Sequence, residues 1–348
     1  MKKTPAVIAG VFLLFTTYIT IPSVQAACGT LSALYDPATY TSGTTLNDQS
    51  GCSSNGTLIA GTPVKTALPA RFVLNQGSTG QYFYQSASVA NPTTYSIAIW
   101  FRTTSASGTK LMGFVQNTGT TETSYDRHLF IGRDGKLFYG VYNGNSITVA
   151  STSAVNDGKW HLAVATQSGT VGRLYLDTAT AVTLSATPQS YTGYWKVGGY
   201  VLTGWSDNTG ALSTGDWVGD VGKTYIYNAT QISAADVTAL YEAGRSMYVS
   251  PTTSIALSSG TSAVYRSATN LQFTSGIDGK VTFFQNNKRI AGCISMTTAS
   301  GAATCPWKPS LITSATSLYA KMTPFDTATA TMTTSAISVP VLRRTNNR

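Results

Sequence analysis

The stretch NDGKWHLAVAT (Asn156–Thr166) joins a turn to a strand, and it decides how the rest of the chain is interpreted. Asn-Asp-Gly favours a tight turn, and the apolar, aromatic and β-branched residues after it favour a strand. Similar runs recur with turn residues between them: SIAIWFRT (96–103), KLFYGVY (136–142), GRLYLD (172–177) and KTYIYN (223–228). Because helices do not alternate with these runs, we expect an all-β fold in which two sheets pack face to face.

One helix is expected after the last of these runs. Residues 233–236, Ser-Ala-Ala-Asp, have the pattern of a capping box, in which Ser233 and Asp236 each bond the other's backbone amide. The apolar residues that follow fall on one helical face, and Gly244 is expected to end the helix. Trp100 and Trp160 lie within strand-like runs, so we expect both in the core.

Together these segments resemble the laminin G-like, concanavalin A-like jelly roll. Residues 35–58, YDPATYTSGTTLNDQSGCSSNGTL, are similar to that family's first hairpin, and residues 219–244 to its closing strand and helix. SIAIWFRT, NDGKWHLAVAT and GRLYLD are similar to central strands in the family order. The resemblance implies a two-sheet jelly roll and a calcium ion shared by Asp48 and Asp220. Residues 220–223, however, are Asp-Val-Gly-Lys where many members carry adjacent carboxylates.

Composition changes near residue 249 and predicts a second domain. Residues 27–249 balance basic and acidic side chains, whereas residues 250–348 contain nine Lys and Arg but only two Asp. We therefore expect a jelly roll at 27–247, a linker at 248–254 and a second domain at 255–348. Within it, KVTFFQNNKRI (280–290) resembles bacterial immunoglobulin-like repeats, which implies an immunoglobulin-like β-sandwich.

The first residues have the order of a secretory signal peptide. Residues 1–5 are basic, residues 6–22 are apolar, and Val24-Gln25-Ala26 offers a small-residue cleavage site. We expect removal of residues 1–26, secretion or attachment at the cell surface, and no membrane span after cleavage. Two alternatives remain: an uncleaved anchor, because the apolar run is nearly long enough to span a bilayer, and a lipoprotein acylated at Cys28.

The four cysteines are expected to form two disulfides. Cys28 and Cys52 lie near one end and Cys293 and Cys305 near the other, and an exported chain meets oxidising conditions. The second pair is expected to close a local hairpin rather than to bridge two sheets, and to stabilise the fold by roughly 3 kcal/mol. A zinc site is the competing use, but the cysteine spacing is wide and the chain has only two histidines.

The residue pattern argues against catalysis. The only two Glu, Glu122 and Glu242, are far apart in the sequence, whereas most glycosidases use a close pair of carboxylates. Patterns of nucleophilic hydrolases and nucleotide-binding loops are absent from the sequence. His161 follows a strand Trp, so we expect it to be buried and hydrogen-bonded. We therefore expect a protein that is not an enzyme and requires no cofactor.

Aromatic and polar residues in TGYWKVGGYVLTGWSDNTG (192–210) favour a carbohydrate-binding site. Aromatic rings stack on sugar faces, and amide, carboxylate and guanidinium groups bond sugar hydroxyls. We expect Tyr194 and an exposed Trp205 to contact the ligand together with Asp207 and Asn208. Arg127 is expected near the rim of this site.

Alternatives remain open at these positions and for the function as a whole. Trp205 could instead lie in the core, and residues 125–128, Tyr-Asp-Arg-His, could form a salt-bridged turn. We expect a secreted protein that recognises glycans or extracellular polysaccharide. The alternative is a structural or adhesive cell-surface protein that contacts other proteins without a small-ligand site. The second domain lacks a dense basic run apart from Arg343-Arg344, which argues against nucleic acid and leaves anionic surface polymers as a salt-screened partner.

Overall fold

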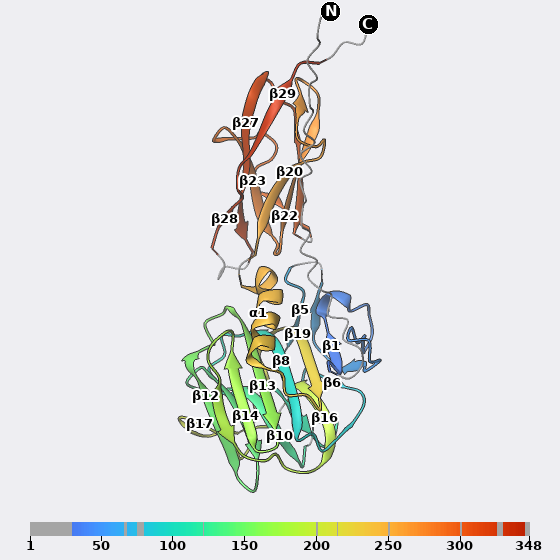
Figure 1. Cartoon of the computed structure of the whole chain (residues 1–348), viewed down its shortest axis with the longest axis vertical. Helices are drawn as coiled ribbons and strands as arrows, with labels where there is room; N and C mark the ends of the chain where they lie inside the picture. The colour runs from blue at the N-terminus through green and yellow to red at the C-terminus, as the bar shows by residue number, and fades with distance from the viewer. Residues whose placement is uncertain are drawn as a thin grey trace, which may run out of the picture.

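Two β-sandwiches stand end to end, with helix α1 (Ala234–Tyr248) at their junction (Figure 1). The computed structural model describes residues 30–344 apart from 66–67, 75–79, 121, 200, 214, 250, 300 and 326–329. The predicted signal peptide and Cys28 lie outside the described residues. In the described part of the chain, no helix has the length and apolar character needed to cross a bilayer.

The first sandwich consists of a back sheet and a front sheet, both antiparallel. The back sheet has the order β15 (Val182–Ser185), β14 (Val171–Leu176), β13 (Trp160–Ser168), β8 (Thr94–Arg102), β19 (Gly219–Asn228), β5 (Arg71–Leu74), β4 (Thr62–Val64), with β1 (Ala33–Tyr35) paired to β19. The front sheet has the order β12 (Ser146–Ala154), β11 (Lys136–Tyr142), β10 (Tyr125–Ile131), β9 (Thr109–Val115), β16 (Thr192–Gly198), β6 (Tyr82–Gln85), β3 (Gly56–Leu58), β2 (Thr45–Leu46), with β7 (Val89–Ala90) paired to β16. Short elements complete it: η1 (Pro37–Thr39), β17 (Ser206–Asp207) and β18 (Gly210–Ala211).

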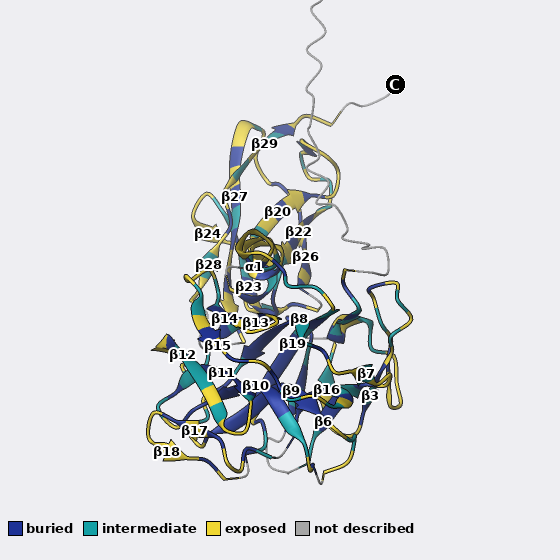
Figure 2. Ribbon diagram, turned by 60° about the horizontal axis from the view of Figure 1, so that its bottom comes forward, coloured by how far each residue is buried: buried dark blue, intermediate teal, exposed yellow. Residues whose placement is uncertain are grey.

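Alternation of side chains along the strands builds the core between the two sheets. Ile97 and Phe101 of β8 lie in the same buried cluster as Phe114 of β9 and Trp195 of β16. The central strands of the back sheet are buried almost throughout (Figure 2), since the opposite face of this sheet is covered as well. The predicted all-β fold with two packed sheets is confirmed.

Helix α1 covers the outer face of the back sheet. Its capping box is present as predicted, with Ser233 Oγ accepting from the amide of Asp236 at 3.2 Å. Trp100 is fully buried beneath the helix and stacks on Tyr248 with ring centroids 4.7 Å apart. The expectation that Gly244 ends the helix is wrong: a Cβ there would lie 2.5 Å from Trp100, so glycine is needed where the helix crosses that ring. The helix instead continues to Tyr248.

The second sandwich pairs a small sheet with a larger one. The small sheet has the order β20 (Thr253–Leu257), β22 (Thr269–Ser275), β26 (Ala302–Trp307). The larger sheet has the order β21 (Ala263–Val264), β29 (Ile337–Leu342), β27 (Thr313–Pro324), β23 (Gly279–Gln285), β24 (Lys288–Arg289), with β25 (Met296–Thr297) on β23 and β28 (Met332–Thr333) on β27. This arrangement is compatible with the immunoglobulin-like fold expected for residues 255–348, and that assignment stays a prediction.

The predicted disulfide between Cys293 and Cys305 is present, with an S–S distance of 2.03 Å. Cys305 belongs to β26 of the small sheet, whereas the carbonyl of Cys293 accepts from the amide of Phe283 on β23 of the larger sheet. The bond therefore joins the two sheets, and the expectation of a local hairpin link is wrong. Sequence separation alone misled here, because the chain crosses from one sheet to the other between the two cysteines.

The junction between the sandwiches is shorter than the predicted linker. Tyr248 is still helical and buried, and Thr253 already belongs to β20, so only residues 249–252 connect the two elements. Asp278 adds a second connection, because its Oδ2 accepts from the amide of Leu68 at 2.9 Å. The domain boundaries at 27–247 and 255–348 stay predictions.

Candidate functional site

Residues 201–213, which we call the strap, lie across the outer face of the front sheet. Leu202, Trp205 and Leu212 of the strap form one buried cluster with Phe130 of β10 and Phe138 of β11. The neighbours of these two phenylalanines along each strand point into the core between the sheets, so the phenylalanines point outward. The strap removes their apolar surface from water, which stabilises its position on the sheet.

Trp205 is only 1% exposed, and the expectation of an exposed ring is wrong. Its ring meets His128 edge-to-face with centroids 4.7 Å apart. The ring also lies over Gly140 of β11, the cross-strand partner of His128, where a Cβ would be 2.5 Å from Trp205 Cζ3. The indole therefore fills the space that this glycine leaves open on the sheet.

Asp207 anchors the strap instead of facing solvent. Its carboxylate accepts from the backbone amide, Nε and Nη2 of Arg133 at 2.7, 3.0 and 3.0 Å, and from Thr209 Oγ1 at 2.7 Å. Burial by itself would raise the pKa of this carboxyl, but the bonds from Arg133 and Thr209 outweigh burial and lower the pKa. Asn208 is exposed, and its amide donates to Asp134 at 2.6 Å.

A pocket of about 340 Å³ lies beside the strap on the same face. We call it the front-sheet pocket. It is lined by Thr123, Ser124, Tyr125, Tyr142, Gln189, Thr203, Gly204 and Trp205. None of these side chains carries a formal charge. Tyr125 and Tyr142 are half-buried, and the Tyr125 hydroxyl donates to the carbonyl of Thr203 at 2.8 Å, which joins the sheet to the strap.

Arg127 is fully buried and supports the pocket from behind rather than forming its rim, so the expectation of a rim residue is wrong. Its φ of 53° lies at a bulge in β10, which turns the side chain inward. It forms an ion pair with Asp126, and the two side chains grip the backbone of Gln189: Arg127 Nη2 donates to its carbonyl at 2.8 Å, and Asp126 Oδ2 accepts from its amide at 3.0 Å. The ion pair expected in the alternative reading of residues 125–128 is therefore present, but these residues form a bulged part of strand β10 and not a turn.

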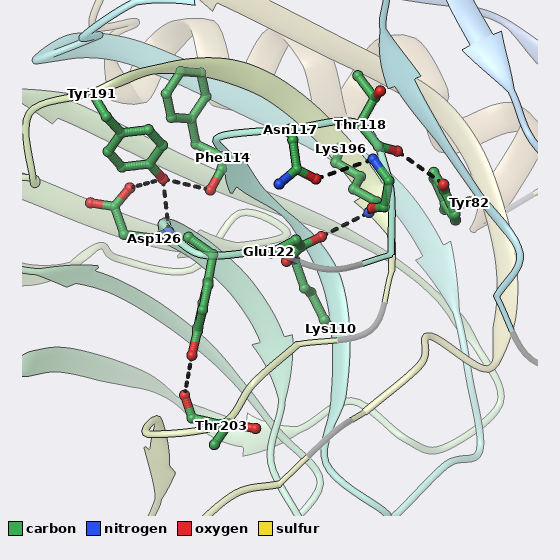
Figure 3. Close-up of polar contacts among 12 residues, drawn as sticks. Tyr82, Lys110, Phe114, Asn117, Thr118, Glu122, Asp126, Tyr191, Lys196 and Thr203 are labelled. Atoms are coloured by element: carbon green, nitrogen blue, oxygen red, sulfur yellow. Dashed lines mark hydrogen bonds and ion pairs between the residues drawn. The ribbon is translucent and has the colours of Figure 1, made fainter.

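A buried ion cluster lies next to the loop that leads into the pocket, and sequence reasoning missed it. Glu122 binds Lys110 Nζ at 2.9 Å and Lys196 Nζ at 2.7 Å, and all three side chains are excluded from solvent (Figure 3). Lys196 Nζ also donates to the carbonyl of Gly119 at 2.7 Å. The only signal in the sequence is a lysine inside each of two otherwise apolar strands. Because Glu122 directly precedes Thr123 and Ser124, these bonds fix the wall of the pocket.

His128 lies between this cluster and Trp205 and is fully buried. Burial, and then the positive charges of Lys110 and Arg127, lower the pKa of His128 well below its usual range. The ring is therefore neutral at physiological pH. It stacks on Tyr125, with centroids 5.9 Å apart, and so supports that tyrosine from below.

Tyr194 lies on the same face but outside the pocket lining. It is in register with Val115 of β9, which is in register with Tyr125 of β10. Two strand spacings of about 4.8 Å therefore separate Tyr194 from Tyr125. Its half-buried ring contacts Tyr84 at a centroid distance of 6.2 Å, so the two rings extend the aromatic surface beyond the pocket.

Asp48 and Asp220 do not fit a shared calcium ion. The Asp48 carboxylate accepts from the amides of Leu34, Ser50 and Ser54 at 2.8 to 3.0 Å. Asp220 is bound by Arg102, with Nε at 2.9 Å, and lies 3.4 Å from Arg71 Nε. These donors occupy the carboxylates, and the two guanidinium groups would repel a cation. Among the residues that the structure describes, no group of three or more His, Cys, Asp or Glu could hold a metal.

Cys52 is half-buried, and its Sγ lies 3.3 Å from the carbonyl of Leu31. This places it near the part of the chain that follows Cys28, which lies outside the described residues. The Cys28–Cys52 disulfide therefore stays a prediction.

Residues 75–238 match the sequence model of a family described as the concanavalin A-like lectin/glucanases superfamily. This part of the chain is a concanavalin A-like domain. The front-sheet pocket, the strap and the buried ion cluster all belong to this domain, whereas the second sandwich lies outside the match. Comparison of the whole chain with curated proteins found no match.

Solved structures similar to the chain include several domains of carbohydrate-active proteins. Domain 4 of the extracellular arabinanase AbnA from Geobacillus stearothermophilus is 14% identical, with 61% of this chain and 98% of that chain covered and a TM-score of 0.39. The CBM40 of the Ruminococcus gnavus IT-sialidase is 16% identical, with 53% and 97% covered and a TM-score of 0.35. Trypanosoma rangeli sialidase is 12% identical, with 63% of this chain but only 33% of the sialidase covered and a TM-score of 0.45. These likenesses are too distant to say what this chain binds.

Proposed function

We propose that the chain recognises a neutral glycan through the front-sheet pocket. The observation that carries this proposal is a lining without charged side chains, in which two half-buried tyrosines stand beside hydroxyl and amide groups. A sugar ring presents apolar C–H faces that pack on aromatic rings, and hydroxyls that exchange hydrogen bonds with Gln, Ser and Thr. Tyr125 and Tyr142 would supply the first kind of contact, and Gln189, Thr123 and Ser124 the second.

The other residues expected at the site have supporting roles in this proposal. Trp205 borders the pocket from the strap, and Asp207 holds the strap through Arg133. Arg127 fixes the backbone of Gln189 from within the domain. Tyr194 would meet a second sugar unit of a longer chain, and the exposed Asn208 would contact ligand only beyond the strap. Micromolar affinity needs about 8 kcal/mol, so several of these contacts must act together.

We further propose that the protein is exported and binds its ligand without altering it. The carboxylates in the segments that line the pocket, Glu122 and Asp126, are fully buried and paired with Lys or Arg side chains. They therefore offer no accessible acid and base for glycoside hydrolysis, which needs a pair of carboxylates flanking the bond. The Cys293–Cys305 disulfide fits an oxidising, extracellular setting.

The test is a screen of the purified chain against neutral polysaccharides and oligosaccharides, followed by titration of the best ligand. Tyr142→Ala should weaken binding about tenfold, because it removes one stacking surface. Tyr227→Ala is the matched control, since this half-buried tyrosine lies on β19 of the opposite sheet.

Two outcomes would refute the proposal: no binding to any neutral glycan, or equal loss of affinity in both variants. Either result would favour the structural or adhesive alternative, in which the concanavalin A-like domain contacts other proteins.

A further inference from the structure

The second sandwich has positive charges without described acidic partners. Asp278 is the one carboxylate that the structure describes after residue 250, and it is buried at the junction with the first sandwich. None of the ion pairs in the described part of the chain involves a Lys or Arg of the second sandwich. These cations are therefore available to an external anion.

Three cations of the second sandwich line a pocket of about 600 Å³ at one side of it. We call this pocket the cationic pocket. Lys288 and Arg289 come from β24, and Lys308 directly follows β26; all three are exposed. The remaining lining is uncharged: Gln285, Asn286, Ile290, Ala291, Pro306, Trp307, Ser310 and Leu311. Leu311 is 68% exposed and adds an apolar surface at the pocket.

The pocket has two walls, residues 285–291 and residues 306–311, and they are joined firmly to each other. The Cys293–Cys305 disulfide links the segments directly beside these walls. Trp307 Nε1 donates to Gln285 Oε1 at 3.0 Å, which bridges the walls a second time. Asn286 is held by its backbone N–H, which donates to the backbone carbonyl of Ser317 at 2.9 Å. The cations thus project from a preorganised frame, which lowers the entropic cost of binding.

We propose that the cationic pocket binds the charged groups of an acidic polysaccharide. Lys and Arg give charge-assisted hydrogen bonds to carboxylate or sulfate groups. Asn286 and Ser310 can bond sugar hydroxyls, and Leu311 can pack on the C–H face of a ring. A single-stranded nucleic acid fits less well, because Trp307, the only aromatic side chain in the lining, is 3% exposed and gives bases no stacking surface.

This site is independent of the front-sheet pocket. The two pockets lie in different sandwiches, and only the second has charged lining residues. One chain would thus bind a neutral glycan with its first sandwich and an acidic glycan with its second. Simultaneous binding of two such polymers would raise the overall affinity for a mixed surface.

Affinity electrophoresis and calorimetry of the full chain test the proposal with polygalacturonate, dextran sulfate and uncharged dextran. We expect binding to at least one acidic polymer, weakened by salt, whereas binding to uncharged dextran should not depend on salt or on the cations of this pocket. Binding to polygalacturonate alone would assign a carboxylate group, and binding to dextran sulfate alone a sulfate group. The triple variant Lys288→Gln, Arg289→Gln, Lys308→Gln should lose about tenfold or more in affinity.

The matched control is Arg266→Gln, Lys280→Gln, Lys321→Gln. It removes one arginine and two lysines from the same sandwich but outside the pocket, and should change affinity by no more than about twofold. Equal losses in the two triple variants would overturn the proposal in favour of diffuse charge attraction. Absence of binding to both acidic polymers would overturn it too, as would tighter pocket-dependent binding to an oligonucleotide or to anionic vesicles. Tyr142→Ala should leave acidic-polymer binding unchanged, which separates this proposal from the preceding one.

Discussion

His161 lies between two carboxylates at the start of β13, an inner strand of the back sheet. Its Nδ1 is 2.9 Å from Asp177 Oδ2, and its Nε2 is 3.2 Å from Asp157 Oδ1. Burial by itself would lower the pKa of this imidazole, but the hydrogen bonds and charges of the two aspartates outweigh burial and raise the pKa. His161 therefore links the turn before β13 to the end of β14, and the two aspartates favour its protonated form.

Stability should depend on pH through this residue. Because the folded-state pKa is above the unfolded value of about 6.5, the contribution is fully present below that pH and is lost as pH rises through the folded pKa. We expect the difference in free energy of unfolding between the wild type and His161→Gln to shrink as the pH rises from about 6.5 to alkaline values. Urea unfolding of both proteins across this range measures it. A difference that does not change with pH would contradict the prediction.

At the scale of the element, the strap is held by apolar packing at its middle and by one polar anchor. Leu202, Trp205 and Leu212 supply the packing, and the Asp207–Arg133 contact supplies the anchor. Gly140 is required on the sheet beneath, because any larger side chain would meet the indole. The front-sheet pocket depends on this arrangement, since the strap contributes Thr203, Gly204 and Trp205 to its lining.

Truncation of Trp205 should therefore destabilise the domain. Trp205→Ala leaves a cavity between the strap and the sheet, and we expect a loss of about 3–5 kcal/mol in the free energy of unfolding. Asn208→Ala on the same strap is the control and should stay within about 0.5 kcal/mol of the wild type, because that side chain is exposed. Denaturant unfolding measures both variants. A Trp205→Ala protein as stable as Asn208→Ala would show that the strap does not depend on the indole.

For the whole molecule, Asp278 is a polar link between the two sandwiches. Its Oδ2 accepts from the amide of Leu68 in the first sandwich at 2.9 Å. Its Oδ1 accepts from Thr298 Oγ1 at 2.6 Å and from the amide of Gly301 at 2.7 Å, both in the second sandwich. One buried carboxylate thus ties a loop of the first domain to two loops of the second.

Asp278→Ala should loosen this junction. The amides of Leu68 and Gly301 would lose their acceptor, and each buried amide left unpaired costs about 1–3 kcal/mol. We expect a broader distance distribution in small-angle X-ray scattering and separate unfolding of the two sandwiches in calorimetry. Ser254→Ala, an exposed change in the same sandwich, should alter neither. Unchanged scattering in Asp278→Ala would show that the sandwiches are held by other contacts.

Local patterns were enough to predict the fold class. Runs of apolar, aromatic and β-branched residues between turn residues predicted central strands of both sheets, and the Ser233–Asp236 capping box predicted the start of α1. The pairing of Cys293 with Cys305 followed from their proximity in sequence. Each of these features depends on residues that are near one another along the chain, so the sequence specifies it directly.

The functional surface depended on contacts between distant segments. The sequence around Trp205 contains aromatic and polar residues, and these suggested an exposed binding surface. It does not reveal that Gly140, sixty-five positions earlier, leaves a space on the sheet that the indole fills. In the same way, Glu122 meets Lys110 and Lys196 only because β9 and β16 are neighbours in the front sheet. Whether an aromatic or charged side chain is buried depends on which surface packs over it, and the tertiary structure alone decides that. The sequence therefore determined which residues were available for binding, and the packing of the strap and of the two walls of the cationic pocket decided which of them solvent can reach.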